Sequence, residues 1–144
     1  LVRSGGLGDV YKRQGIRDWS SRDNFSIKTY KFQSPLTKYP ENKNLCLLID
    51  PKGQKISVTI RLESKFLSRE NNIGDFSYTQ KVQGDGPKEI VVPQEAFKSS
   101  SNRKIEWSKI ATMEISMMNM ENKQRISLTS SGEDGYLKSI KFTD

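Results

Sequence analysis

Three closely spaced glycines in the stretch SGGLGDVYKRQ, residues 4–14, are the first feature that could do chemistry. A phosphate-binding glycine turn needs a buried strand before it and a helix after it, because the helix N-terminus supplies free N–H groups. Only four residues precede Gly5, and the residues that follow show no sustained apolar period of 3.6. Val10 and Tyr11 also follow Gly8 where the dinucleotide and Walker motifs need other residues. The pattern therefore disfavours a phosphate loop.

The same region carries two resemblances with different implications. The string GGLGDV resembles the nucleotide-sugar loop of glycogen and starch synthases, which implies an enzyme fragment such as a glycosyltransferase. The longer string LVRSGGLGDVYKRQ resembles a translated sequencing-adapter remnant that recurs at the ends of metagenomic protein predictions. We favour the second interpretation, since that resemblance is highly specific and covers all of residues 1–14, and a chain that begins with Leu1 rather than Met fits it. It predicts a disordered, non-native leader over residues 1–14 and a domain over 15–144, the C-terminal part of a larger protein that could include an enzyme.

Aromatic residues with polar neighbours are the candidates for carbohydrate binding. Sugars present flat apolar faces and a rim of hydroxyls, so a site supplies an exposed aromatic plane with carboxylate, amide or arginine partners. The alternative for each aromatic is a half-buried core position. The candidate groups are Trp19 with Asp18 and Arg22, Tyr39 with Asn42, Phe66 with Arg69 and Asn72, and Tyr78 with Gln80.

The remaining reactive residue types give no catalytic set. Histidine is absent, which removes the commonest general base and metal ligand. Cys46 is the single cysteine, and its apolar neighbours indicate a buried, inert thiol. Acidic pairs could hydrolyse glycosides, but no motif singles out two of them. We predict no catalytic residue, no metal ligand and no cofactor, while a structural calcium stays open. The acidic strings GDG (84–86) and GEDG (132–135) lack an EF-hand pattern and predict turns.

Size and charge bound the class of protein. The 144 residues less the 14 of the leader leave 130, enough for one domain with a single core. Without the leader the net charge falls from +7 to +5, because the leader holds three basic residues and one acidic residue. Lysines alternate with acids and form no stripe, so nucleic-acid binding is not predicted. No stretch approaches the ~20 apolar residues of a membrane span.

Short segments with apolar residues at alternate positions predict an all-β fold. The clearest is ISVTIRL, in which Ile56, Val58, Ile60 and Leu62 share one face. LCLLID (45–50) is apolar on both faces, as in a central strand, and PKGQ (51–54) predicts a tight turn of the kind that joins hairpins. Further strands are expected in FSIKTYKF (25–32), FSYTQKV (76–82), KEIVV (88–92), RISL (125–128) and LKSIKF (137–142).

Residues 107–120 fit either a helical stripe or a strand, and we favour a short turn over Trp107–Lys109 followed by a strand. PQEAF (93–97) predicts one helical turn. The total is about eight strands, with at most one short helical turn, in an antiparallel β-sandwich. Phe97 and Trp107 are assigned to the core, and the methionines are assigned to core or edge filling.

The run from Phe76 to Met117 resembles the second half of a galactose-binding-like jelly roll. The markers in this run are IVVP (90–93), Phe97, EWSKI (106–110) and MEI (113–115). LKSIKF (137–142) matches the closing strand of the same group. The resemblance implies a carbohydrate-binding module, or an accessory domain like those of bacterial glycoside hydrolases, sulfatases or the complex I intermediate-associated protein family. It covers about residues 25–143 and is weakly specific for function.

Three functions remain open. The first is a non-catalytic β-sandwich module of a secreted bacterial carbohydrate-active protein, located outside the cytoplasm, whose partners are a polysaccharide or oligosaccharide and a catalytic domain in the same chain. The second is a structural or interaction module that packs against a catalytic domain and binds no sugar. The third is an enzyme fragment in which the glycine loop is genuine.

Overall fold

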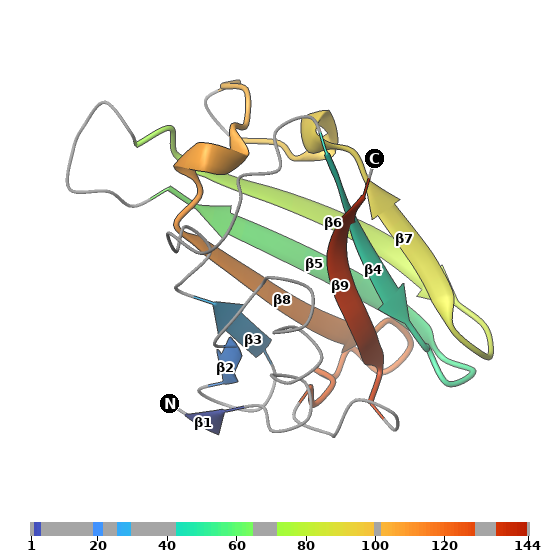
Figure 1. Ribbon diagram of the computed structural model, residues 1–144. Coiled ribbons are helices and arrows are strands. Elements are labelled where there is room, and N and C mark those ends of the chain that lie inside the picture. Colours follow the sequence, from blue (N-terminus) through green and yellow to red (C-terminus); the bar gives the residue numbers. More distant parts are fainter. Residues whose placement is uncertain are drawn as a thin grey trace.

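The computed structural model describes residues 2–3, 19–21, 26–29, 43–64, 72–99, 102–128 and 135–143. Two antiparallel sheets face each other in this part of the chain, which confirms the predicted all-β sandwich (Figure 1). One sheet has the order β1-β2-β3-β8-β5-β6, and the other has the order β7-β4-β9. The strands are β1 (Val2–Arg3), β2 (Trp19–Ser21), β3 (Ser26–Thr29), β4 (Asn44–Ile49), β5 (Lys55–Glu63), β6 (Asp75–Gln83), β7 (Lys88–Val92), β8 (Thr112–Asn119) and β9 (Leu137–Thr143).

The two longest strands follow the alternation read from the sequence. In β5, Ile56, Val58, Ile60 and Leu62 are buried, while the residues between them are exposed or half-buried. β6 runs antiparallel to β5 over its full length, from the Lys55–Gln83 pair to the Glu63–Asp75 pair. β5 therefore has one dry face and one wet face, as period-2 patterning requires.

The β4 strand is the centre of the three-stranded sheet, as its apolar character on both faces predicts. It pairs with β7 on one side and with β9 on the other. The turn at Pro51–Gln54 forms with the Gln54 N–H donating to the Pro51 carbonyl at 3.0 Å. Both central residues have positive φ, 54° at Lys52 and 76° at Gly53. The turn does not close a hairpin, however, because it leads from β4 in one sheet to β5 in the other.

A bulge explains the spacing of apolar residues in the last strand. The β4–β9 register shifts between Leu48 and Ile49, so Ile49 pairs with Leu137 while Leu48 pairs with Ser139. Leu137 and Ile140 are both buried although they lie three residues apart. The extra residue of the bulge lets both side chains reach the core.

Two expectations about local structure need correction. RISL (125–128) is not a strand: Arg125 makes an isolated bridge with Met118, and only Ile126 and Leu128 are buried. Burial of two alternating side chains does not require a continuous ladder. Single 3-10 turns occur at both η2 (Gln94–Ala96) and η3 (Trp107–Lys109), one more than the single helical turn that was counted. Residues 107–119 otherwise form the turn and strand that were favoured.

The residues assigned to the core occupy it. Trp107 is fully buried and Phe97 is 3% exposed. Met113 and Met117 are buried on the inner face of β8, whereas Met118 faces outward and is 40% exposed. The methionines thus divide between core and surface according to strand parity.

A short strand at the N-terminus pairs with β2, and the non-native leader over residues 1–14 stays a prediction. Val2 pairs with Ser21 and Arg3 pairs with Ser20, which adds β1 to the edge of the six-stranded sheet. Such an addition rests on main-chain hydrogen bonds, which any sequence supplies. Residues 4–14, with their glycines, lie outside the described residues.

Candidate functional site

Of the seven residues predicted to bind carbohydrate, two have described side chains. Tyr78 and Gln80 share the inward-facing row of β6 with Phe76 and Val82, and both are half-buried. The Tyr78 hydroxyl donates to Gln80 Oε1 at 2.5 Å. Trp19 is placed by its backbone alone, in β2. Arg22, Tyr39, Phe66 and Arg69 lie outside the described residues.

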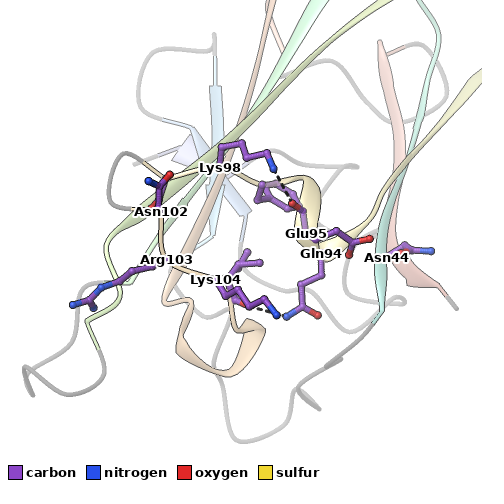
Figure 2. A pocket seen from close by; sticks show the side chains of 10 residues that line it. Asn44, Gln94, Glu95, Lys98, Asn102, Arg103 and Lys104 are labelled. Atoms are coloured by element: carbon purple, nitrogen blue, oxygen red, sulfur yellow. Dashed lines mark hydrogen bonds between the residues drawn. The ribbon is translucent and has the colours of Figure 1, made fainter.

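A pocket in the described part of the chain lies beside η2, between the end of β7 and the segment that leads to η3 (Figure 2). Its volume is about 660 Å³. It lies within the size range of small-ligand sites, about 300–1,000 Å³. Its lining residues are Asn44, Gln94, Glu95, Phe97, Lys98, Ser99, Asn102, Arg103, Lys104 and Ile105.

The backbone on one side of this pocket is fixed by a short series of hydrogen bonds. Pro93 ends β7, and its carbonyl accepts from the Ala96 N–H at 3.0 Å. Two residues later, Lys98 pairs with Ser77 of β6 through two backbone hydrogen bonds of 2.9 and 3.0 Å. The chain therefore crosses from the edge of one sheet to the edge of the other, and η2 forms the crossing point.

The floor of the pocket is apolar and belongs to the core. Phe97 and Ile105 are both buried. The Phe97 ring contacts Trp107 with the centroids 5.4 Å apart, and it contacts Tyr78 at 5.9 Å. The candidate Tyr78 therefore contacts the floor residue Phe97 and is not itself among the residues that line the pocket.

The opposite wall is connected to the floor through polar side chains. The Gln94 amide donates to the Ile105 carbonyl at 2.9 Å, which ties η2 to residues 102–105. The Trp107 indole N–H donates to the Lys43 carbonyl at 3.2 Å, next to Asn44 at the start of β4. The hydrogen bonds bring three distant segments of the chain to one end of the sandwich.

The rim of the pocket carries more positive than negative charge. Lys98, Arg103 and Lys104 are exposed cations, and Glu95 is the acidic residue among the lining residues. The Lys98 ammonium lies 3.4 Å from the Glu95 carbonyl. The Arg103 guanidinium points away from the other labelled side chains in Figure 2 and donates to the Asn72 carbonyl at 3.1 Å.

A network of hydrogen bonds around Ser64 holds the segment that Arg103 contacts. The buried Ser64 hydroxyl donates to the Gly74 carbonyl at 2.6 Å and accepts from the Ile73 N–H at 2.9 Å. Asn72 Oδ1 lies 3.1 Å from the same hydroxyl. Ser64 thus joins the end of β5 to the start of β6 and fixes the carbonyl that holds Arg103.

The acidic GDG string forms the predicted turn at the opposite end of the sandwich. Gly84 and Gly86 have positive φ, and the Gly84 carbonyl accepts from the Gly53 N–H at 3.0 Å. Beside this turn, the Gln54 side-chain N–H donates to the Tyr136 hydroxyl, and Gln54 Oε1 accepts from the Asn119 side-chain N–H, each at 2.8 Å. The described residues contain no group of three potential metal ligands. Most of GEDG lies outside them.

Cys46 lies on the outer side of β4, covered by its neighbours. The thiol is 3% exposed, and burial together with the nearby Glu89 carboxylate raises its pKa. The nearby Lys141 acts in the opposite direction without reversing the shift. A raised pKa keeps the sulfur protonated and a poor nucleophile, as the apolar sequence around it indicates.

The sequence does not identify the pocket residues as candidates. The sugar-binding candidates were aromatic residues expected to be exposed, whereas the aromatic residue of the pocket is the buried Phe97. Gln94, Asn102 and Lys104 are ordinary polar residues without a motif, and only the fold brings them together.

Comparison with protein-family models, curated proteins and solved structures finds no significant match for this chain. In the part of the chain that the structure describes, no helix has the length and apolar character needed to cross a bilayer.

Proposed function

We propose that this chain is a non-catalytic β-sandwich module that binds carbohydrate in the η2 pocket. The observation that carries the proposal is the combination of an apolar floor, Phe97 and Ile105, with a rim of amides and charged groups. Such a lining matches the two sides of a sugar, because its C–H faces prefer apolar surface and its hydroxyls need hydrogen-bond partners.

The amide side chains at the rim suit hydroxyl groups in particular. Asn44, Gln94 and Asn102 each carry a donor and an acceptor, and a sugar hydroxyl both donates and accepts. Glu95 adds a charged acceptor on the exposed side of η2. A ligand lying against the floor would meet these groups around its edge.

The kind of larger protein to which the module belongs is proposed from the sequence resemblance. The two antiparallel sheets support a galactose-binding-like jelly roll, although many functions use such sandwiches. We propose an accessory module of a secreted bacterial carbohydrate-active protein, located outside the cytoplasm and attached to a catalytic domain. Trp19, Arg22, Tyr39, Phe66 and Arg69 stay predictions as additional sugar contacts.

Affinity electrophoresis in gels that contain soluble polysaccharides tests the proposal. We expect retardation by at least one glycan, and we expect Asn44→Ala to weaken it because that side chain lines the pocket. Gln83→Ala is the matched control, since Gln83 is exposed at the far end of β6. Retardation that neither variant changes would place the site elsewhere, and no retardation on any glycan would reject the proposal.

One observation favours a second candidate, an interaction module that packs against another domain. Val91 is 44% exposed on the outer face of β7, next to Cys46 of β4 in the ladder. An exposed apolar residue on a sheet is consistent with a covered face in a larger protein, but a single residue is also common on free surfaces. Absence of glycan binding together with loss of domain association in Val91→Lys would favour this candidate.

A further inference from the structure

We infer that the ligand of the η2 pocket carries negative charge, as in an acidic saccharide with carboxylate or sulfate groups. The inference rests on the proposed function and adds the chemical class of the sugar. Three of the ten lining residues are basic and one is acidic, so the lining has a formal charge of 3 − 1 = +2. A hollow lined mainly by one sign of charge concentrates ligands of the opposite sign.

The distribution of the three cations matters more than their number. Arg103 is engaged with the Asn72 carbonyl, and its guanidinium points away from the pocket in Figure 2. Lys98 follows η2 and Lys104 precedes Ile105, so the two lysines come from different segments of the pocket lining (Figure 2). An anion held in the pocket is therefore attracted by two ammonium groups.

Lysine is suited to this role because its ammonium acts as a point charge on a flexible stem. The Lys98 ammonium lies 3.4 Å from the Glu95 main-chain carbonyl, a contact that holds it near η2. An ammonium has three N–H donors, so a contact with one carbonyl leaves donors for an anionic group. Two lysines without a fixed fork geometry accommodate a carboxylate or a sulfate.

Glu95 gives the inference its sharpest test. If the ligand is neutral, the Glu95 carboxylate is a useful acceptor for hydroxyls, and its replacement by Gln weakens binding. If the ligand is anionic, the same carboxylate repels it, and Glu95→Gln strengthens binding. Glu95 is exposed on the 3-10 turn η2, none of whose residues is buried. Its replacement by the similarly sized Gln therefore leaves the fold intact.

The experiment compares matched pairs of glycans on the full chain. Polygalacturonate is paired with its methyl ester, and a sulfated galactan is paired with its desulfated form, so that charge is the main variable. We expect binding to the charged member of at least one pair to be about tenfold tighter than to the neutral member, which is the size of a favourable charge contact. Binding should weaken with added salt because the lysines are exposed.

Variants then locate the effect. Lys98→Gln with Lys104→Gln should weaken binding of the acidic glycan about tenfold, and Glu95→Gln should strengthen it severalfold. Lys55→Gln with Lys81→Gln is the control, because it removes the same charge from exposed positions near the opposite end of β5 and β6. Thermal unfolding of each variant shows whether the fold is retained.

The outcomes separate the two proposals. Equal binding of charged and neutral glycans, or weaker binding by Glu95→Gln, overturns the anionic ligand while the carbohydrate module stands. Equal loss in the control pair also overturns it, because the attraction is then a property of net charge. No binding to any glycan overturns the proposed function itself, and binding to acidic peptides or nucleic acid without glycan binding does the same.

Discussion

The Trp107 indole meets the Phe97 ring edge to face, with centroids 5.4 Å apart and ring planes at 80°. Trp107 also meets Phe142 of β9 in the same manner, at 5.2 Å and 70°. The rings connect the floor of the pocket to both sheets, since Phe97 follows η2 and touches Tyr78 of β6. The shape of the pocket therefore depends on the same contacts that stabilise the core.

The first prediction concerns Trp107. Replacement by Ala removes a fully buried aromatic side chain and should lower the free energy of unfolding by about 3–5 kcal/mol. Urea denaturation followed by circular dichroism measures the loss. Trp107→Phe keeps a ring against Phe97 and should lower the free energy of unfolding by less. Met118→Ala, at an exposed position, should change it by under about 0.5 kcal/mol. Similar losses for Trp107→Ala and Met118→Ala would contradict the role given to the aromatic contacts.

A second prediction concerns the buried hydroxyl of Ser64. Ser64→Ala leaves the Ile73 N–H and the Gly74 carbonyl without this partner, and an unsatisfied buried group costs about 1–3 kcal/mol. Chemical denaturation measures it. Thr79→Ala is the control, since the Thr59–Thr79 hydroxyl pair is exposed and its loss leaves both groups in water. A loss no larger than that of the control would show that the Ser64 hydrogen bonds are dispensable.

The two turn glycines Gly53 and Gly86 give a third, paired prediction. Both have similar positive φ, 76° and 79°, so replacement by Ala carries a similar backbone cost of about 1 kcal/mol at each. A Cβ at Gly53 would also lie 2.9 Å from Asp85 Oδ1, whereas a Cβ at Gly86 meets nothing within 4 Å. The Asp85 carboxylate is the exposed end of a flexible side chain and can turn aside at little cost, so Gly53→Ala should destabilise the fold only slightly more than Gly86→Ala.

Stability measurements on the two single variants and on Gly53→Ala with Asp85→Ala check this reading. If the close contact matters, the added Asp85→Ala substitution should bring Gly53→Ala down to the cost of Gly86→Ala. If the double variant is as unstable as Gly53→Ala alone, backbone strain at Gly53 accounts for the whole effect.

The fourth prediction concerns alkaline pH and Cys46. Burial, reinforced by Glu89, raises the pKa of this thiol above its usual value, so the folded state holds the proton more tightly than the unfolded state. The contribution to stability is complete below the unfolded pKa, about 8.5, and is lost as pH rises from there through the folded pKa. Wild type should lose more stability than Cys46→Ala between pH 8 and pH 10.

Thiol labelling gives an independent measurement of the same shift. Cys46 in the folded chain should react slowly with iodoacetamide at pH 8.5, and Glu89→Gln should speed the reaction because one cause of the raised pKa is removed. A folded protein that is labelled as fast as the urea-unfolded chain would show that the thiol is neither covered nor shifted.

The strands could be predicted where a single face decides burial. Ile56, Val58 and Ile60 alternate without exception, and no other element satisfies that spacing. Leu45–Ile49 was recognisable as a central strand because both of its faces are apolar. Patterns of this kind depend only on residues within one segment, so the sequence alone is sufficient to predict such a strand.

Relationships between segments could not be predicted in the same way. The residues of Pro51–Gln54 indicate a turn, but they do not determine whether the next strand pairs with the last one or joins the opposite sheet. Ile126 and Leu128 are buried at alternate positions without forming a strand, because the tertiary fold covers them. The pocket had no sequence signal, since its polar residues come together only through the crossing of η2 between the sheet edges.

The central position of β4 has a consequence for how the chain acquires its fold. Leu45 is paired with Phe142, and 97 positions of sequence separate them. The three-stranded sheet therefore cannot be completed until Phe142 has been synthesised, because β9 supplies its last strand. Contacts between residues so distant in sequence are associated with slow folding. We therefore expect the apolar faces of the two sheets to stay partly exposed to solvent in nascent chains until β9 joins β4.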